Sequence, residues 1–158
     1  MRLWIAPHGM HVEPAKAEDA ERLAELHADA FFRGWPAADF AAYAIDRSTP
    51  GYVVADRARK VQGFLMLRLA GEEAEILTVA IDRKQRRKGF GAALLKAAIE
   101  DLLQSPARAL FLEVDESNVA ARRLYRRFGF RETGRRKDYY QTESGKPASA
   151  LVLRLDLG

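Results

Sequence analysis

The spacing of apolar residues along the first half of the chain predicts an alternation of helices and strands. Between residues 18 and 31, apolar side chains recur every three or four positions, which is typical of an amphipathic helix. A short strand at 10–13 should precede this helix, and a second short helix should end near residue 46. Three apolar runs separated by short polar turns then predict antiparallel strands; they cover 52–55, 61–69 and 74–81.

The second half continues the alternation and completes a single domain. We expect a helix at 89–103, a strand at 110–114, a helix at 118–128 and two final strands, at 130–135 and 150–157, which flank a polar loop that contains Tyr139 and Tyr140. This order predicts one α/β domain over residues 10–158, with a mixed sheet of about seven strands and helices on both faces. Residues 1–9 are interpreted as a candidate disordered extension outside the fold.

Composition excludes several classes of chemistry. The 158 residues include no cysteine, which excludes disulfides, a thiol nucleophile, iron–sulfur clusters and cysteine-bound zinc. The three histidines, His8, His11 and His27, lack carboxylate partners at metal-binding spacing, so we expect no metal site. No apolar run approaches the roughly 18 residues of a membrane helix. The first ten residues are too weakly apolar for a secretory signal, so we expect a cytoplasmic protein without a membrane partner.

Charge is unevenly distributed along the chain. The net charge is +4, from 26 basic and 22 acidic residues, but the segments 83–88 and 122–137 hold 13 of the basic residues and a single acidic one, Glu132. The rest of the chain is therefore acidic. A basic region of this kind indicates an anionic partner, either a phosphate-bearing cofactor or a nucleic acid, unless its charges simply face solvent.

The first basic segment leads into a glycine-containing loop between a strand and a helix. In the run Arg86-Arg87-Lys88-Gly89-Phe90-Gly91, the glycines allow close backbone approach, and the helix start offers free N–H groups to a phosphate. The run lacks the Lys-Ser/Thr of a Walker motif and the third glycine of a Rossmann fingerprint. Taken alone, it is equally well a glycine-assisted helix start beside a solvated basic turn.

This loop resembles the acetyl-CoA signature Arg-x-x-Gly-x-Gly of the GNAT acetyltransferase superfamily. The resemblance continues through the rest of the chain, in Leu112-Glu113-Val114, Asn118, Leu124-Tyr125 and Gly129-Phe130. Two further segments, Arg135-Arg136 with Tyr139-Tyr140 and Phe32-Arg33-Gly34-Trp35, are similar to the bacterial ribosomal-protein-alanine N-acetyltransferases. These enzymes modify the N-terminus of a small-subunit ribosomal protein. The similarity runs from Met10 to the C-terminus.

The resemblance implies a GNAT fold whose sheet is splayed at the site of acetyl-CoA, the co-substrate. The pantetheine arm would pair with the backbone of the strand at Val79, Ala80 and Ile81, and the Val79 N–H would donate to the thioester oxygen. Asn118 would contact the cofactor further along. The pyrophosphate would be held by the residues Arg86, Arg87, Lys88, Gly89, Phe90, Gly91 and Ala92.

The resemblance also implies two catalytic residues. Glu113 would be the general base. A carboxylate inside an apolar strand is costly to bury unless it is paired or hydrated, so its presence there needs an explanation. The alternative is a structural glutamate held by an arginine. Tyr125 would be the general acid for the leaving thiolate, although its helical spacing also suits an ordinary core aromatic, and the two roles are compatible.

For the acceptor, the family similarity implies the N-terminal α-amine of a protein, expected to be ribosomal. Trp35, Tyr139 and Tyr140 would line its groove; a packed hairpin is the alternative for the tyrosines. Ser149-Ala150 departs from the acidic residue and alanine usual near the last strand, which affects the acceptor half. Alternative acceptors are therefore a small amine, a polyamine or a lysine side chain.

A different class of function would use the arginines of the second basic segment. Arg122, Arg123, Arg126 and Arg127 lie on the helix face opposite its apolar stripe and could bind RNA or the ribosome without any turnover. Simple solvation of these arginines is favoured over nucleic-acid binding.

Overall fold

A computed structural model describes residues 2–31, 33–141 and 147–158; the side chains of residues 138–141 and 147 lie outside that description. The predicted order of helices and strands is confirmed, and β1 is an additional strand. None of the described helices has the length and apolar character that crossing a bilayer would need. In chain order the elements are β1 (Trp4–Ile5), β2 (His11–Pro14), α1 (Ala20–Ala30), α2 (Ala37–Ile45), β3 (Gly51–Ala55), β4 (Val61–Ala70), β5 (Glu73–Ile81), α3 (Phe90–Leu103), β6 (Ala109–Asp115), α4 (Val119–Arg127), β7 (Arg131–Gln141) and β8 (Pro147–Asp156).

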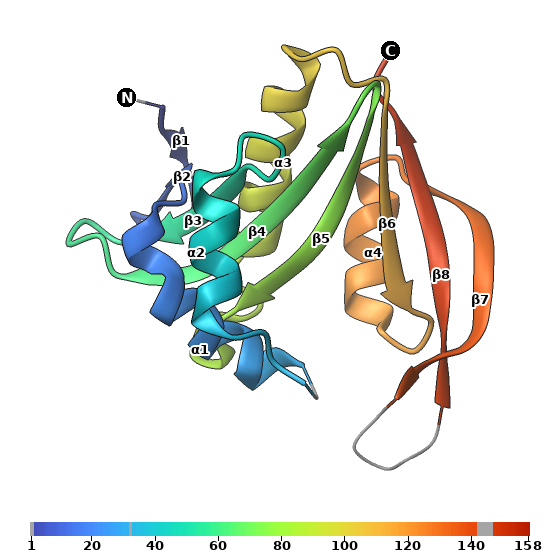
Figure 1. Cartoon of the computed structure of the whole chain (residues 1–158), viewed down its shortest axis with the longest axis horizontal. Helices are drawn as coiled ribbons and strands as arrows, with labels where there is room; N and C mark the ends of the chain where they lie inside the picture. Colours follow the sequence, from blue (N-terminus) through green and yellow to red (C-terminus); the bar gives the residue numbers. More distant parts are fainter. Residues whose placement is uncertain (1, 32, 142–146) are drawn as a thin grey trace.

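The described strands form one mixed sheet in the order β1-β2-β3-β4-β5-β6-β8-β7. Every neighbouring pair is antiparallel except β5 and β6, which run parallel. These two strands pair only through Glu73–Glu75 and Ala109–Phe111 and then diverge, as Figure 1 shows. We call this divergence the splay. The expected mixed sheet, splayed in its middle, is confirmed.

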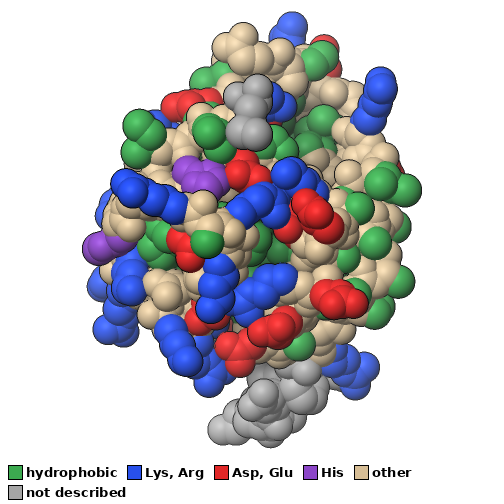
Figure 2. Space-filling view, turned by 90° about the vertical axis from the view of Figure 1, so that its left-hand side faces the viewer, with side chains coloured by type: hydrophobic (Ala, Val, Ile, Leu, Met, Phe, Trp, Pro, Cys, Tyr) green, Lys and Arg blue, Asp and Glu red, His purple; other side chains and the backbone are tan. Residues whose placement is uncertain are grey.

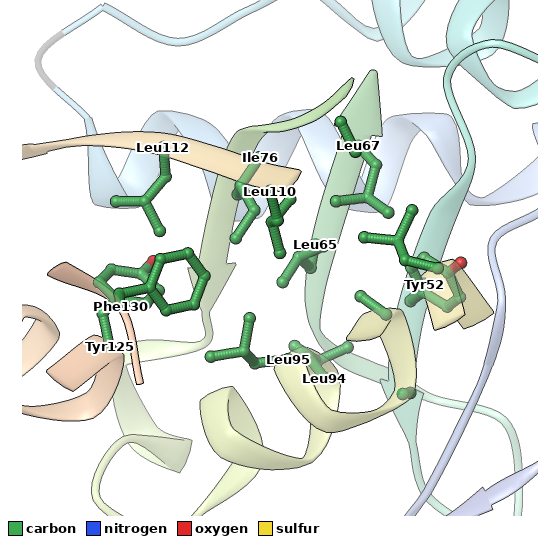
Figure 3. Packing of buried hydrophobic residues seen from close by; sticks show 14 of the residues in the cluster. Tyr52, Leu65, Leu67, Ile76, Leu94, Leu95, Leu110, Leu112, Tyr125 and Phe130 are labelled. Atoms are coloured by element: carbon green, nitrogen blue, oxygen red, sulfur yellow. The ribbon is translucent and has the colours of Figure 1, made fainter. Parts of the chain in front are cut away.

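Helices cover both faces of the sheet, and the alternation of side chains along the strands explains why. Leu65, Leu110 and Leu112 point toward α3 and α4, where they pack with Leu94 and Tyr125 (Figure 3). The opposite face packs Phe64 and Met66 against the helices α1 and α2. Burial of each such side chain contributes about 1.5–3 kcal/mol. We call the face of the sheet covered by α3 and α4 the α3 face, and the face covered by α1 and α2 the α1 face.

The N-terminal residues differ from the sequence-based expectation. Trp4 and Ile5 pair antiparallel with β2, and the connecting turn places His8 and Gly9 at φ angles of 59° and 72°. Two successive positive φ values are typical of the tight turn of a hairpin. Trp4 also packs edge-on against Tyr52, with 5.7 Å between ring centroids. Residues 4–9 are therefore a hairpin arm of the sheet and not a disordered extension; a two-residue strand is too short to show periodicity.

The C-terminal hairpin also differs from expectation. β7 continues to Gln141, so the backbone of Tyr139 and Tyr140 belongs to a strand rather than to a polar loop. Tyr140 pairs with Ala148 of β8. β7 is the last strand of the sheet, and such an edge strand can carry polar residues on both faces, which removes the alternation that would have predicted it.

Candidate active site

The splay leaves one edge of β5 open on the side of β6. From Ile76 to Ile81, β5 pairs with β4 but has no register with β6 among the described residues. An open strand edge presents backbone N–H and C=O groups that an extended amide-containing ligand can pair with. The edge therefore suits the two amides of a pantetheine arm. Val79 and Ile81 turn their side chains to the α3 face, and Ala80 turns to the α1 face.

A β-bulge interrupts β5 at the start of the splay. Leu67 of β4 lies opposite Ile76, but the preceding Met66 lies opposite Thr78, so Leu77 is the extra residue. A bulge re-aims the side chains that follow it. Here it turns Thr78 to the α1 face, the face of its partner Met66.

The basic loop after β5 is held in shape by its backbone and by α1. Arg87 and Gly89 have φ angles of 64° and 85°, and Gly89 immediately precedes α3. Asp82 accepts a hydrogen bond of 2.9 Å from the Lys84 N–H and pairs with Arg22 of α1 at 2.8 Å. The hydrogen bond from Arg22 lowers the pKa of Asp82. The loop thus has a fixed geometry at the start of α3.

The chemistry of this loop fits a pyrophosphate. The first N–H groups of α3 have no acceptor within the helix, and the helix dipole is positive there. Arg86, Arg87 and Lys88 are exposed around them. Two of these side chains also make local contacts, since Arg86 donates to the Ile81 carbonyl and Lys88 to Gln85. Phe90 is buried, so only its backbone can face a ligand.

Glu113 lies on β6, across the splay from the bulge. Its neighbours Leu112 and Val114 point into the core on the α3 face, so Glu113 points to the α1 face. Its side chain is 23% exposed, and Oε1 lies 3.2 Å from Nε of Arg136 on β7. The structural alternative, a carboxylate paired with an arginine, is thus present. A carboxylate has further lone pairs, so this pair leaves it able to accept another hydrogen bond.

Tyr125 and Asn118 both belong to α4. Tyr125 is buried, with its ring centroid 5.4 Å from that of Phe130, as the core interpretation expects (Figure 3). The Asn118 side chain accepts a hydrogen bond from the Ala121 N–H at 3.1 Å and so caps α4. Asn118 therefore has a structural role that the sequence did not predict. α4 also lies against the start of α3, where a β-carbon on Gly91 would be 3.5 Å from the side chain of Leu124.

Trp35 lies in the connection between α1 and α2, packed on His27. The ring centroids lie 4.6 Å apart in a stacked arrangement, and the backbone N–H of Trp35 donates to Nδ1 of His27 at 3.1 Å. Burial lowers the pKa of His27 to about 4. A side chain on Gly34 would lie 2.8 Å from the Ala28 backbone, so this position requires glycine. Phe32 and the side chains of Tyr139 and Tyr140 lie outside the described residues.

Several other charged residues are paired with one another. On the side shown in Figure 2, positive and negative side chains are intermingled. Arg59 pairs with Glu13 and with Asp19, the latter at 2.7 Å. Burial acts to raise the pKa of Glu13, but hydrogen bonds from Arg59 and His11 outweigh it and lower the pKa overall.

Three of the four arginines of α4 have local explanations as well. Arg122 donates to the Glu116 carbonyl at 2.9 Å. Arg126 and Arg127 lie in the last turn of the helix, where the negative end of the dipole favours cations.

Comparison with known proteins identifies the family. Residues 20–130, which are more than half of the chain, match the acetyltransferase (GNAT) family. The match includes β5, the basic loop after it, β6 and α4. The chain belongs to the GNAT acetyltransferase family. As a GNAT enzyme it is an N-acetyltransferase that uses acetyl-CoA as co-substrate.

Three similar proteins extend this assignment. A Bacillus subtilis (strain 168) protein, provisionally named as a ribosomal protein bS18-alanine N-acetyltransferase, is 30% identical over 92% of this chain and 95% of its own length. The crystal structure of the Escherichia coli ribosomal-protein-S18-alanine N-acetyltransferase has a TM-score of 0.86 at 26% identity and covers 94% of both chains. Arabidopsis thaliana NAA60, solved with acetyl-CoA, shares the fold with a TM-score of 0.83 at 21% identity, covering 94% of this chain and 98% of its own.

Sequence reasoning did not predict which residues form two ion pairs near the expected site. Glu113 pairs with Arg136, and Asp82 pairs with Arg22. The two members of each pair are distant in the sequence, so no local pattern predicts the pairing. Asp82 was detectable, because an acidic residue directly before a basic turn is a common cap. Within the described parts of the chain, no three histidine or acidic side chains gather as metal ligands.

Proposed function

We propose that this enzyme transfers the acetyl group of acetyl-CoA to the N-terminal α-amine of a protein, and that the acceptor is a ribosomal protein. The observation that carries this proposal is the similarity to the B. subtilis relative, which extends over nearly all of both chains and so includes the acceptor half. An α-amine has a pKa near 7.7–8.0, against about 10.4 for lysine, so more of it is neutral and nucleophilic at pH 7. A ribosomal acceptor also implies that the enzyme works in the cytoplasm.

On the α3 face, the protein's task is to hold the cofactor. The backbone of residues 87–92 and the side chains of Arg86, Arg87 and Lys88 would bind the pyrophosphate, supported by the positive φ angles of Arg87 and Gly89. The open edge of β5 at Val79, Ala80 and Ile81 would pair with the pantetheine arm. Acetyl-CoA supplies the thioester carbonyl that the amine attacks. The Val79 N–H would donate to that carbonyl oxygen, and the Asn118 amide group would contact the cofactor while its oxygen caps α4.

On the α1 face, Glu113 would accept the proton that the amine loses, directly or through a water molecule. Its partial exposure and its position across the splay from the bulge support this role. Arg136 would hold the carboxylate in orientation through Oε1. From α4, Tyr125 would give a proton to the departing thiolate, in addition to its packing in the core.

The acceptor itself would enter between the α1–α2 connection and the C-terminal hairpin. Trp35, held by His27, would form one wall, and Tyr139 and Tyr140 would form the other. Because these walls come from connections and an edge strand, they are the parts of a fold that vary most with substrate.

The test is an acceptor panel with acetyl-CoA, in which CoA release is measured. The panel contains peptides with a free N-terminal Ala or Ser, the same peptides with an acetylated N-terminus and an internal lysine, and polyamines. We expect turnover on the free N-termini and at least about tenfold less on the others. Turnover confined to blocked lysine peptides or to polyamines would overturn the proposed acceptor while leaving the acetyltransferase chemistry intact.

A further inference from the structure

One buried hydroxyl group near the splay lacks a partner. Among the described residues, the oxygen Oγ1 of Thr78 is the one buried side-chain polar atom without a hydrogen bond, and the residue is only 6% exposed. Leaving a buried polar group unsatisfied costs about 1–3 kcal/mol. Valine has nearly the same shape and would avoid this cost, so the hydroxyl is unfavourable for folding alone.

The bulge determines where this hydroxyl points. In a regular strand without a bulge, Thr78 would share the α3 face with Ile76, because every second side chain of a strand lies on one face. With the bulge, Thr78 shares the α1 face with its partner Met66. The hydroxyl is thus on the same face of the sheet as the Glu113 carboxylate.

Thr78 and Glu113 also lie at the same level along their strands. The last paired residues before the splay are Glu75 and Phe111. Two residues further along each parallel strand are Leu77 and Glu113, and Thr78 follows directly. The hydroxyl and the carboxylate therefore flank the splay from its two sides, on the face away from α3 and its phosphate-binding start.

We propose that Thr78 positions the acceptor, by forming a hydrogen bond between Oγ1 and the first residue of the incoming peptide. This inference rests on the proposed function, since it requires a peptide N-terminus beside Glu113. A hydroxyl can both accept from an amine N–H and donate to a carbonyl, and the first residue of a peptide offers both groups. Because Oγ1 is buried in the free enzyme, this role requires the side chains that cover it to move as the acceptor enters. Thr78 transfers no proton itself.

The Thr78 hydroxyl would contact the acceptor and not the cofactor. Thr78 faces away from α3, whereas the phosphate-binding groups are at the start of α3. Loss of the hydroxyl should therefore weaken productive acceptor binding and leave acetyl-CoA binding unchanged. If the hydroxyl had only a structural role, its loss would leave the acceptor kinetics unchanged.

The experiment compares Thr78→Val, which removes the hydroxyl at nearly constant shape, with Thr78→Ser, which keeps it. Thermal unfolding, acetyl-CoA affinity, and kcat and KM for a peptide with N-terminal Ala are measured for each. For Thr78→Val we expect a Tm equal to or above wild type, unchanged acetyl-CoA affinity, and kcat/KM for the peptide lowered about tenfold. Thr78→Ser should recover kcat/KM to within about threefold of wild type.

Each outcome decides between the proposals. If Thr78→Val keeps the wild-type kcat/KM, the role of Thr78 is wrong and the proposed function stands. If Thr78→Val loses acetyl-CoA affinity to the same extent as kcat/KM, the hydroxyl contacts the cofactor instead. A wild-type enzyme that acetylates no free N-terminus overturns the proposed function, and the role of Thr78 with it. Should Thr78→Val fail to fold, Thr78→Ser against Thr78→Ala repeats the comparison with smaller side chains.

Discussion

On the α3 side of the splay, the proposed site uses mainly backbone groups, whereas on the α1 side it uses side chains from separate elements. The open edge of β5 and the start of α3 are formed within residues 76–92, a single stretch of chain. Trp35, Thr78, Glu113 and Arg136 come from four distant positions. A ligand held by backbone groups has a compact sequence signature, but a ligand held by dispersed side chains does not.

The same contrast separates the two substrates of the proposed reaction. The residues on the cofactor side can stay the same while those on the acceptor side change. The acceptor side is built from connections and an edge strand, which support little of the core. Variants on the two sides should therefore divide into those that affect acetyl-CoA and those that affect the acceptor or the chemistry.

The largest expected effect is on the chemical step at Glu113. Replacing Glu113 with Gln removes the proton acceptor but preserves size, so kcat should fall by about 10²–10⁴-fold, while acetyl-CoA affinity stays within about twofold. Steady-state kinetics and acetyl-CoA titration measure the two quantities. Glu116→Gln is the matched control, since Glu116 is also paired with an arginine, Arg135 at 2.6 Å. Parallel loss of affinity and rate would show that Glu113 is not the base.

The next effect concerns pH and the wall formed by Trp35. Because the pKa of His27 is lowered to about 4 by burial, the unfolded protein takes up a proton below about pH 6.5 and the folded protein does not. Above this pH, His27 therefore causes no loss of folding stability. Stability should fall, by at most about 1.4 kcal/mol per pH unit, as the pH decreases toward 4.

Denaturant unfolding from pH 7 to 5 measures this slope. His27→Asn is the comparison, because its amide oxygen can still accept from the Trp35 N–H and does not titrate in this range. The difference in free energy of unfolding between the two proteins should change with pH. A difference that is constant over the window would mean that His27 is not the titrating group.

A smaller effect is expected where the phosphate loop joins α1. Replacing Asp82 with Ala removes both its pairing with Arg22 and its cap on the turn at residues 83–85, so KM for acetyl-CoA should rise about fivefold at constant kcat. Asp29→Ala is the control, since it removes only the exposed pair with Arg83. A rise in KM for the acceptor instead would contradict the division between the two sides.

The smallest effect is expected from the α4 arginines. Replacing Arg126 and Arg127 with Gln should change kinetics on short peptides by less than about twofold, because these side chains only complement the end of the helix. Kinetics on an intact ribosomal subunit serve as the comparison. A loss on both substrates would bring α4 into the peptide site and break the comparison of the two faces.

Much of the fold was predictable because its signals are local. The helical spacing of α1, α3 and α4 and the apolar runs of β3, β4, β5 and β6 predicted those elements to within a few residues. The prediction failed at the edges of the sheet, in the two-residue strand β1 and in the continuation of β7 beyond residue 135, where no buried face imposes a pattern. The His8-Gly9 turn was a usable signal for the first hairpin.

The sequence by itself indicated the family and its co-substrate acetyl-CoA, because the motifs that carry the resemblance, such as the glycines and basic residues before a helix, each span a few neighbouring positions. Only the tertiary structure decided which residues share the splay. It paired Arg136 with Glu113, set Trp35 on His27, and turned the Thr78 hydroxyl toward the α1 face through one extra residue in β5. Such contacts depend on strand register, and a shift of one residue moves a side chain to the other face of the sheet.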